Sequence, residues 1–477
     1  MGEPDRGIET AMATFAAQLR YDDLPADVVF DAKFRVLDWI GCALAGTRTE
    51  PARVAATIAR EMSGAPQATV IRQGMKLPMS QAAWVNGVAG HVVEFDDGHR
   101  LAVAHPGAVT VPVALALGEH LGRSGKEIIT AVVAGYEVLI RLGIAVSPSH
   151  YKYWHTTSTC GAFAADGVAT SLLQLDLPTA RMALGIAGTL ASGLQETFGT
   201  HAKPLNIGHA CQSGIQAALL AKAGFTGSHT IIMGKKGFVA ATSTDRELTL
   251  LEQINKKEFL SHTAFYKMYS SCGHTHSPLD ATFSLIQANE ISAPDIRNIR
   301  IDTYKTSVDL TGQLKNQTED EAKFSLPYCI ACALLYKSVT LEEFTPARLQ
   351  DPELLELARK IHIVEDEAAT RAFPARHANV RIEFSDGRVL EKKMEGANDT
   401  PQYESLKNKF VSLAVPAVDA ATALIDGPAT VTFENTSAAS QDLRVLINRL
   451  DRAVRELERN PQGFVVGEPV PYEEKRR

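Results

Sequence analysis

Apolar positions recur at intervals of three and four residues through most of the first 225 residues of the chain. This spacing is typical of helices that bury one face. Several of the segments end at a glycine, a common helix stop. They are rich in Ala, Gly and Ser, whose small side chains let helix axes approach closely. We therefore expect a compact all-α domain with helices over residues 27–46, 80–94, 108–122, 127–147, 158–174, 178–195 and 205–223.

The pattern changes after about residue 268. "IRNIRIDTY" (296–304) and "NVRIEFSDGRVLEKK" (379–393) alternate apolar and polar residues, and Asp386-Gly387 is a turn signal between the arms of the second stretch. Helical sequence such as "SPLDATFSLIQANE" and "DPELLELARKIHIV" lies between them. The middle of the chain is therefore predicted to form a smaller α+β domain.

Beyond about residue 404 the helical spacing returns, and it ends in the amphipathic stretch "QDLRVLINRLDRAVRELERN". The last residues, "EPVPYEEKRR", have the composition of a loose tail. The chain is therefore expected to be mainly α with an α+β part. A large helical domain would comprise residues 1–267 and 404–465, followed by a tail at 466–477, and a smaller α+β domain would comprise residues 268–403.

Charge and hydropathy limit the classes of partner. The chain has 477 residues and a formal net charge of −7, which argues against nucleic acid or an anionic membrane as the main partner. Residues 128–146 form an apolar run long enough to span a membrane. Glu137 and Arg141 lie within it, four residues apart, which is an ion-pair spacing on a helix. We predict a buried core helix and no membrane partner.

The N-terminal sequence has neither the apolar core of a signal peptide nor the Arg-rich character of a transit peptide. The six cysteines are widely spread, and the one C-x-x-C spacing, Cys329 and Cys332, lies in apolar sequence without a partner pair. Structural thiols are favoured over redox or metal use. This cysteine usage is typical of a reducing cytoplasm.

The stretch "EFDDGHRLAVAHPG" (94–107) carries the first candidate chemistry. The adjacent carboxylates of Asp96 and Asp97 repel each other, which raises the pKa of at least one of them. His105 follows nearby and can exchange a proton near neutral pH. Acid–base catalysis needs this combination. A loop whose acids cap the next helix or pair with Arg100 is the alternative.

Two further segments suit anion binding. His155 precedes the run "TTST", which would begin a helix, and the free backbone N–H groups of a helix start favour an anion. Lys203 precedes Pro204, a residue favoured in a first helical turn, so its ammonium and that helix terminus would form a cationic pocket for a carboxylate. Packing of His155 beside Trp154 and a snorkelling surface Lys203 stay open as alternatives.

Cys272, His274 and His276 alternate, so in an extended segment they would face one way and suggest a metal site. No second Cys/His pair lies close by. Residues 277–280 instead resemble an N-cap serine, a first-turn proline and a capping-box acid, which places the histidines at a helix N-terminus where anions bind. Lys267, upstream, would add positive charge there. No nucleotide-binding fingerprint is present, so nucleotide cofactors are not expected.

Six stretches together resemble the MmgE/PrpD family, which includes 2-methylcitrate dehydratase, cis-aconitate decarboxylase and iminodisuccinate epimerase. They are "AAWVNGVAGHVVEFDDGH", "AHPGAVTVPVALALGE", "WHTTSTCGAFAA", "KPLNIGHACQSGIQAALLAKAGFTG", "SCGHTHSPLDA" and "EDEAKFSLPYCIACALL". Each alone is a weak signal, whereas six in the same order are specific.

The resemblance implies a helical domain built from both ends of the chain and a smaller lid domain from its middle. It also implies a pocket between them that binds di- or tricarboxylates without a metal or organic cofactor, and commonly a homodimer. Transferred position by position, the catalytic residues would be Asp96, His105 and His155. The substrate-binding residues would be Lys203, Lys267, Asp97, His276 and, as a weaker candidate, Tyr328.

Proton removal α to a carboxylate creates an enediolate-like dianion that needs cations and N–H donors already in place. Lys203, Lys267 and helix N-termini could supply them. His155 or Asp96 could take the proton, and His105 could donate one to a departing hydroxyl, which releases water. Return of the proton to the opposite face would make the same site an epimerase, and loss of carbon dioxide would make it a decarboxylase.

The expected order of activities begins with 2-methylcitrate dehydratase, the best-known activity of the family, followed by an iminodisuccinate epimerase-like isomerase. Decarboxylation ranks last. Residue 98 is Gly where several relatives carry Thr or Ser, and the loop from Asp97 to His105 differs in length from the decarboxylase pattern. A metallohydrolase that uses Cys272 with its neighbouring histidines, and a non-catalytic polycarboxylate-binding protein, remain as alternatives from other classes.

Overall fold

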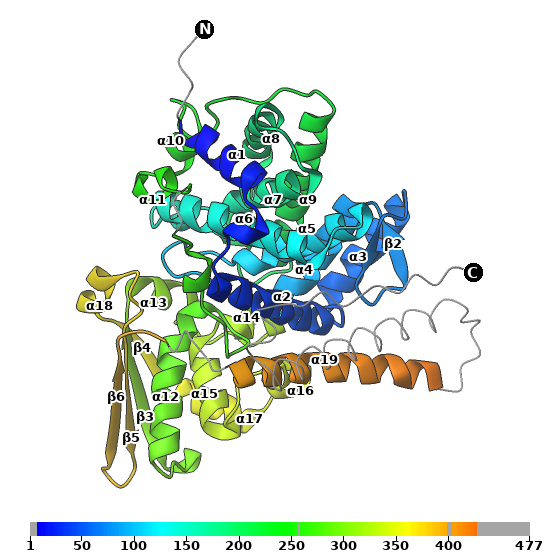
Figure 1. Ribbon diagram of the computed structural model, residues 1–477. Coiled ribbons are helices and arrows are strands. Elements are labelled where there is room, and N and C mark those ends of the chain that lie inside the picture. The colour runs from blue at the N-terminus through cyan, green and yellow to red at the C-terminus, as the bar shows by residue number, and fades with distance from the viewer. Residues whose placement is uncertain (1–6, 256–257, 398–402, 427–477) are drawn as a thin grey trace.

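The computed structural model of the chain describes residues 7–255, 258–397 and 403–426 (Figure 1). All seven helices predicted in the N-terminal half are present. The predicted ranges did not include α1 (Ile8–Gln18), α3 (Glu50–Met62) or the short hairpin of β1 (Ala68–Val70) and β2 (Met75–Leu77). The long helices of this half are α1 (Ile8–Gln18), α2 (Ala26–Gly46), α3 (Glu50–Met62), α4 (Met79–Val92), α5 (Pro106–Leu121), α6 (Gly125–Val146), α7 (Thr156–Leu173), α8 (Leu177–Leu190) and α9 (Ala202–Lys222).

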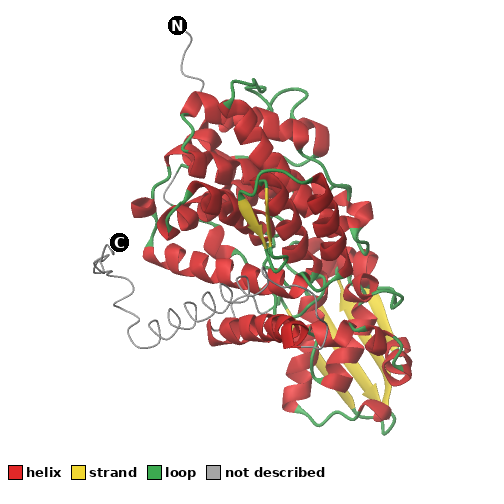
Figure 2. Cartoon of the chain, turned by 90° about the vertical axis from the view of Figure 1, so that its right-hand side faces the viewer, coloured by secondary structure: helices red, strands yellow, loops and turns green. Residues whose placement is uncertain are grey.

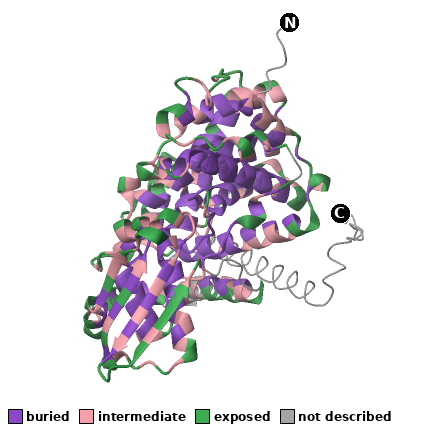
Figure 3. Ribbon diagram, turned by 90° about the vertical axis from the view of Figure 1, so that its left-hand side faces the viewer, coloured by how far each residue is buried: buried purple, intermediate pink, exposed green. Residues whose placement is uncertain are grey.

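Helix α6 is a core helix of this domain, since every residue from Ile129 to Val146 is buried. Figure 3 shows the buried residues, in purple, gathered in the middle of the helical domain. Helix α6 is the one helix of the described residues that is long and apolar enough to cross a membrane. Its charged pair is satisfied inside the protein, because Arg141 Nε donates to Glu137 Oε2 over 2.9 Å and Glu137 Oε1 accepts the backbone N–H groups of Leu260 and Ser261. The prediction of a buried core helix with an internal ion pair is confirmed.

Small residues set the spacing of the central helices, as expected from their abundance. Gly214 of α9 lies directly against α7, where a Cβ at this position would lie 2.4 Å from the backbone nitrogen of Asp166. Gly135 of α6 lies as close to Thr110 of α5 and Val168 of α7, each 2.6 Å from an added Cβ. Since α7 and α9 each begin at the candidate site, this close packing fixes where their N-termini lie.

The sheet domain, from α12 to β6, contains a four-stranded sheet in the order β4-β3-β5-β6 (Figure 2). Strands β3 and β4 are parallel and the other pairs are antiparallel. Alternate residues of β5 are buried, as the sequence pattern predicts. A second hydrophobic core joins the sheet to helices α12 and α15. The elements are α12 (His276–Ala288), β3 (Ile296–Thr303), α15 (Leu326–Tyr336), α17 (Pro352–Arg359), β4 (Ile361–Glu365), β5 (Ala378–Phe384) and β6 (Val389–Met394).

Shorter helices connect these elements: α10 (Phe238–Thr242), α11 (Thr249–Glu252), α13 (Lys305–Thr311), α14 (Glu319–Lys323), α16 (Pro346–Leu349) and α18 (Glu367–Ala372). Overall, the prediction of a mainly α fold with an α+β part is confirmed.

Two local predictions are wrong. The stretch "DPELLELARKIHIV" is helical only to Arg359, because the alternating Ile361 and Ile363 pair in parallel with β3 as strand β4. Helix α12 begins at His276, before the expected N-cap Ser277. The expected capping acid, Asp280, instead accepts a hydrogen bond from the Tyr269 hydroxyl over 2.6 Å.

The chain returns to the helical domain through α19 (Tyr403–Asp426), which lies along α2 (Figure 1). The Tyr403 ring packs against Phe30 and Phe34, with centroids 4.6 Å from each. The Lys409 ammonium lies 2.6 Å from Asp38 Oδ1 of α2. The amphipathic helix predicted near residues 441–460 and the tail at 466–477 lie outside the described residues.

Candidate active site

Residues 93–105 follow α4 and form a loop whose backbone is held by three side chains from distant parts of the chain and by its own His105. Four consecutive or nearly consecutive carbonyl groups each accept one such hydrogen bond: Val93 from Ser270 (2.7 Å), Glu94 from Lys267 (3.0 Å), Phe95 from Lys409 (2.6 Å) and Asp97 from His105 Nδ1 (2.6 Å). Glu94 and Val103 have positive φ angles, 53° and 49°. Strain of this kind persists only where surrounding contacts enforce it, and it is frequent at functional sites.

Glu94 is the central anion of this loop, although the sequence did not single it out. It is buried, and its carboxylate forms ion pairs with both Lys203 and Lys267. Burial alone would raise the pKa of the Glu94 carboxyl, but the two ammonium groups outweigh burial and hold it well below its usual range. In the sequence Glu94 is one of three acids in "EFDD", and no spacing rule distinguishes it from the other two.

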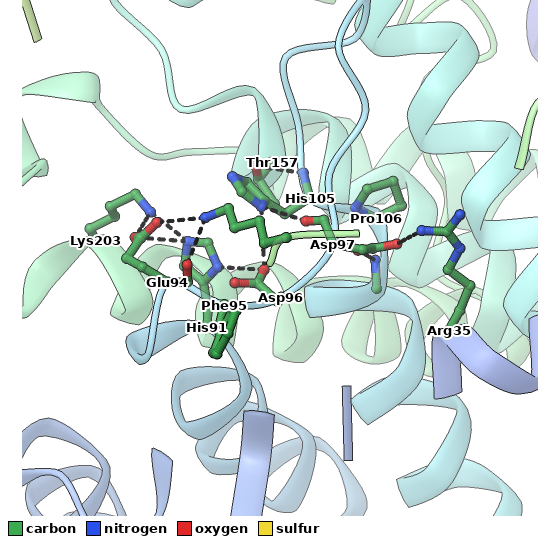
Figure 4. A network of polar contacts seen from close by, with 12 residues as sticks. Arg35, His91, Glu94, Phe95, Asp96, Asp97, His105, Pro106, Thr157 and Lys203 are labelled. Atoms are coloured by element: carbon green, nitrogen blue, oxygen red, sulfur yellow. Dashed lines mark hydrogen bonds and ion pairs between the residues drawn. The ribbon is translucent and has the colours of Figure 1, made fainter. Parts of the chain in front are cut away.

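A chain of side-chain contacts links Lys203 to His105 through His91 and Asp96 (Figure 4). Lys203 Nζ donates to His91 Nε2 over 2.8 Å, so the ring proton of His91 lies on Nδ1, which donates to Asp96 Oδ2 over 2.8 Å. His105 Nδ1 lies 3.4 Å from the same carboxylate oxygen. His91 is a second residue that sequence reasoning missed, since it lies inside an apolar helix.

The protonation of His105 follows from its partner. The Asp97 carbonyl oxygen can only accept, so His105 Nδ1 carries the proton, and the lone pair lies on Nε2. Burial, together with nearby Lys267, lowers the pKa of His105 well below its usual range despite the opposing effect of Asp96. Burial and Lys203 lower the pKa of His155 in the same way. Both rings are therefore neutral at neutral pH.

Three helices begin at the site. His105 immediately precedes α5, His155 immediately precedes α7, and Lys203 lies in the first turn of α9. The free N–H groups and the dipole at each helix start favour an anion. The expectation that His155 and Lys203 stand at helix starts is confirmed. His155 itself occupies the N-cap position, where the sequence favoured its Thr/Ser neighbours, and its side chain forms no cap hydrogen bond.

These residues enclose a cavity of about 30 Å³ between the helical domain and the segments that lead into the sheet domain. The helical domain contributes His105, His155, Lys203 and Glu94 to the wall, with Tyr151, Thr157 and Phe198. Residues from later in the chain complete it: Phe265, Cys272, Gly273, His274, Phe324 and Arg376. The cavity holds about one water molecule, so a tricarboxylate enters only if the walls move apart.

Gly98 shows why the loop carries no hydroxyl at this position. A Cβ on Gly98 would lie 2.6 Å from the Phe265 ring, and the backbones of the two residues exchange hydrogen bonds of 2.9 and 2.7 Å. Phe265 therefore occupies the space that a Ser or Thr side chain would need. The cavity wall is apolar there.

The other predicted site residues lie around the cavity without lining it. Asp96 and Lys267 are buried directly behind the lining residues and contact His105 and Glu94, respectively. Asp97 faces the opposite way (Figure 4), where it accepts hydrogen bonds from Tyr136 (2.7 Å), Arg35 (3.3 Å) and the Gly107 backbone (3.0 Å). Burial raises the pKa of Asp97 to about 6 against the effect of Arg35.

Tyr328 and His276 are placed further from the cavity. The Tyr328 hydroxyl donates to the Glu343 carbonyl over 2.8 Å inside the core of the sheet domain. The His276 ring packs edge-on against Tyr269, with centroids 5.2 Å apart. Neither residue is part of the cavity wall.

The structure separates the three residues that suggested a metal site. His274 Nδ1 lies 2.6 Å from the Tyr304 hydroxyl, whereas His276 packs among aromatic rings. Cys272 is a buried free thiol on the cavity wall, and burial raises its pKa. Together they form no group of converging ligand atoms within the described ranges.

Another group does have converging atoms. One ligand atom each from His91, Asp96 and His105 lies within 4.8 Å of the others. Both histidines already direct Nδ1–H groups at hydrogen-bond acceptors, however, and Lys203 and Lys267 bring two ammonium groups to the cluster. The charge and the proton positions fit hydrogen bonding better than metal coordination.

Comparison with known proteins gives two family matches. Residues 10–251 match the MmgE/PrpD N-terminal domain, and residues 269–426 match the MmgE/PrpD C-terminal domain. A cis-aconitate decarboxylase of Aspergillus terreus is 28% identical over 444 residues, which cover 87% of this chain and 90% of the relative. The cis-aconitate decarboxylase of Homo sapiens is 29% identical over 403 residues, which cover 82% and 83% of the two chains.

Proposed function

The chain belongs to the MmgE/PrpD family and is a lyase-type enzyme, and from that premise we propose that it removes a proton α to a carboxylate of a di- or tricarboxylic acid. The hydroxyl group on the neighbouring carbon then leaves as water, as in 2-methylcitrate dehydratase. The proposed catalyst is made of side chains and helix N-termini alone, without a metal or organic cofactor.

The observation that carries this proposal is the state of His105. Its Nδ1 donates to the Asp97 carbonyl, and no described residue is a hydrogen-bond partner of its Nε2. A neutral imidazole with a free lone pair on the wall of the cavity is a general base. The carboxylate of Asp96, 3.4 Å from Nδ1, stabilises the imidazolium that forms when the base takes a proton.

The proposed reaction has two steps. His105 Nε2 takes the proton from carbon, and the C–H electron pair forms an enediolate stabilised by Lys203 and the N-termini of α5, α7 and α9. That electron pair then forms a carbon–carbon double bond as the C–O bond of the neighbouring carbon breaks. The departing hydroxyl takes the proton from the His105 imidazolium and leaves as water.

His155 supports this step as a hydrogen-bond donor. The Asn206 amide lies 3.4 Å from His155 Nδ1, so an amide N–H directed at that atom leaves the ring proton on Nε2. The sequence suggested His155 or Asp96 as the base. The hydrogen-bond pattern supports His105 in both roles, with the Asp97 carbonyl as the group that orients its ring and Asp96 as the carboxylate that stabilises its imidazolium.

Decarboxylation of cis-aconitate is the second candidate, and the relatives support it, because they are named cis-aconitate decarboxylases. In that reaction the C–C bond to a carboxylate breaks, carbon dioxide leaves, and the carbanion takes a proton from a protonated histidine. The neutral state of His105 supports proton abstraction as the first step and thus favours dehydration. Epimerisation would use the same first step. A homodimer remains a prediction.

Proton NMR in heavy water tests these alternatives. Metal-stripped protein is mixed with 2-methylcitrate, citrate, cis-aconitate and aspartate-derived acids, and His105→Asn is the matched control. We expect new vinylic signals from a hydroxy acid, reduced at least about a hundredfold in rate by His105→Asn. Carbon dioxide release from cis-aconitate would support the decarboxylase, and exchange of an α-proton with an intact skeleton would support the epimerase. Turnover that His105→Asn leaves unchanged would refute the assignment of the base.

A further inference from the structure

Arg376 is a buried cation at the cavity, and none of the carboxylates that the structure describes forms an ion pair with it. It lies between α18 and β5, is 5% exposed and lines the cavity. Its Nη1 donates to the Gly273 carbonyl over 2.9 Å. Its Nε has no hydrogen-bond partner, and no described Asp or Glu lies within ion-pair distance of its guanidinium group. An unpaired buried charge is costly, so its retention suggests a role in binding.

The other cations of the site already have carboxylate partners. Lys203 and Lys267 share Glu94, and Asp96 lies close enough to Lys267 to raise the lysine pKa, after Glu94, against the effect of burial. Two ammonium groups therefore face two carboxylates in this cluster. The positive charge of Arg376 is left over for a ligand.

Arg376 also stands apart from that cluster. Lys203 contacts Glu94, His91 and the rings of Phe198 and Phe324. Arg376 contacts Gly273, and its guanidinium carbon lies 5.5 Å from the centroid of the Phe265 ring. Both cations line the cavity, and they share none of these contacts.

We propose that Arg376 binds a second carboxylate of the substrate, remote from the carbon that His105 deprotonates. This inference rests on the proposed function. A planar guanidinium can receive both oxygens of a carboxylate, and its unpartnered Nε–H is one of the donors available for that contact. The substrate class is therefore an acid with carboxylates at two ends, one near Lys203 and one near Arg376. Monocarboxylic acids would lack the second contact.

Binding of citrate and of lactate, measured by isothermal titration calorimetry, tests this assignment. Arg376→Met should weaken citrate binding at least about tenfold, since a hydrogen bond to a charged group is lost, and should leave lactate binding close to that of the wild type. Arg376→Lys keeps the positive charge but lacks the paired planar donors of a guanidinium group. Its affinity for citrate should lie between those of the wild type and Arg376→Met. The control Arg371→Met removes an exposed arginine of α18 and should bind both acids as the wild type does.

The thermal unfolding of the unliganded variants separates binding from a structural role. Removing an unpaired buried charge should leave the unfolding temperature of Arg376→Met unchanged or higher. A lower temperature together with equal weakening for both acids would mean that Arg376 only holds the Gly273 turn, and would overturn the proposal. Citrate binding by the wild type that neither Arg376 variant weakens would also overturn it while leaving the proposed function intact. If the wild type binds no acid with two or more carboxylates, both the assignment of Arg376 and the proposed function are overturned.

Discussion

At the residue scale, Asp97 has the partners of a structural anchor. Both of its carboxylate oxygens accept hydrogen bonds, from Tyr136, Arg35 and the Gly107 backbone. In Asp97→Asn, one amide N–H group must face a donor, because neither Arg35 nor the Gly107 N–H can accept. We expect a loss of about 2 kcal/mol in the free energy of unfolding, measured by urea denaturation, and little change in KM. Unchanged stability with weaker substrate binding would instead support the substrate-binding role expected from the sequence.

Also at the residue scale, Glu94 pairs with two buried lysines. Its replacement by Gln leaves two buried ammonium groups, those of Lys203 and Lys267, without their shared carboxylate. We expect the unliganded Glu94→Gln variant to lose about 3 kcal/mol of stability. Citrate supplies carboxylates, so it should raise the unfolding temperature of the variant by more than that of the wild type. An equal citrate effect on the two proteins would contradict this reading of the cluster.

At the scale of elements, the distance between α7 and α9 positions the site, because His155 and Lys203 stand at their starts. An added Cβ on Gly214 would lie 2.3 Å from Ala165 Cβ, so Gly214→Ala must push the helices apart. We expect a loss of about 2 kcal/mol in urea denaturation, together with lower activity. The matched control is Gly125→Ala, where no other residue lies within 4 Å of the new Cβ, and its stability should not fall. Equal stability of the two variants would refute the close-packing argument.

At the scale of the whole molecule, buried neutral histidines make the fold sensitive to acid. Burial lowers the pKa of His99 to about 3 and of His150 to about 4. Burial also lowers the pKa of five others, at positions 91, 105, 155, 274 and 276. The unfolded chain binds these protons near pH 6.5 and the folded chain only at lower pH. Stability is therefore complete above about pH 6.5 and falls as the pH is lowered.

The size of this effect is about 1.4 kcal/mol per pH unit for each histidine that stays neutral. Buried carboxyls whose pKa values burial raises oppose it: Asp38, Asp96, Asp97, Glu137 and Asp166. Urea denaturation at several pH values between 7.5 and 5 measures the net effect. His150→Gln should reduce the slope by the contribution of one proton. A free energy of unfolding that stays constant down to pH 5 would contradict the prediction.

The sequence predicts the helices well because each is a long run of apolar and small residues, and α6 and α7 are buried on nearly all sides. Strand β4 was missed because "IHIV" continues a helical stretch, and its partner β3 is about 60 residues away. Asp96, His105, His155 and Lys203 could be found from local patterns of charge and helix start. Glu94, His91 and Arg376 could not, because their roles depend on tertiary contacts. Nor could sequence show that the adjacent side chains Asp96 and Asp97 point to opposite sides.

The backbone of residues 93–97 is held largely from outside, since side chains remote in sequence bind three of its carbonyl groups and His105 binds a fourth. A backbone carbonyl is the same whatever side chain its residue carries. The path of the loop therefore depends on the side chains that hold these carbonyl groups as well as on the loop's own anchors, Glu94 and Asp97. Ser270, Lys267 and Lys409 thus shape the site without lining the cavity, so a survey of cavity contacts alone would overlook them.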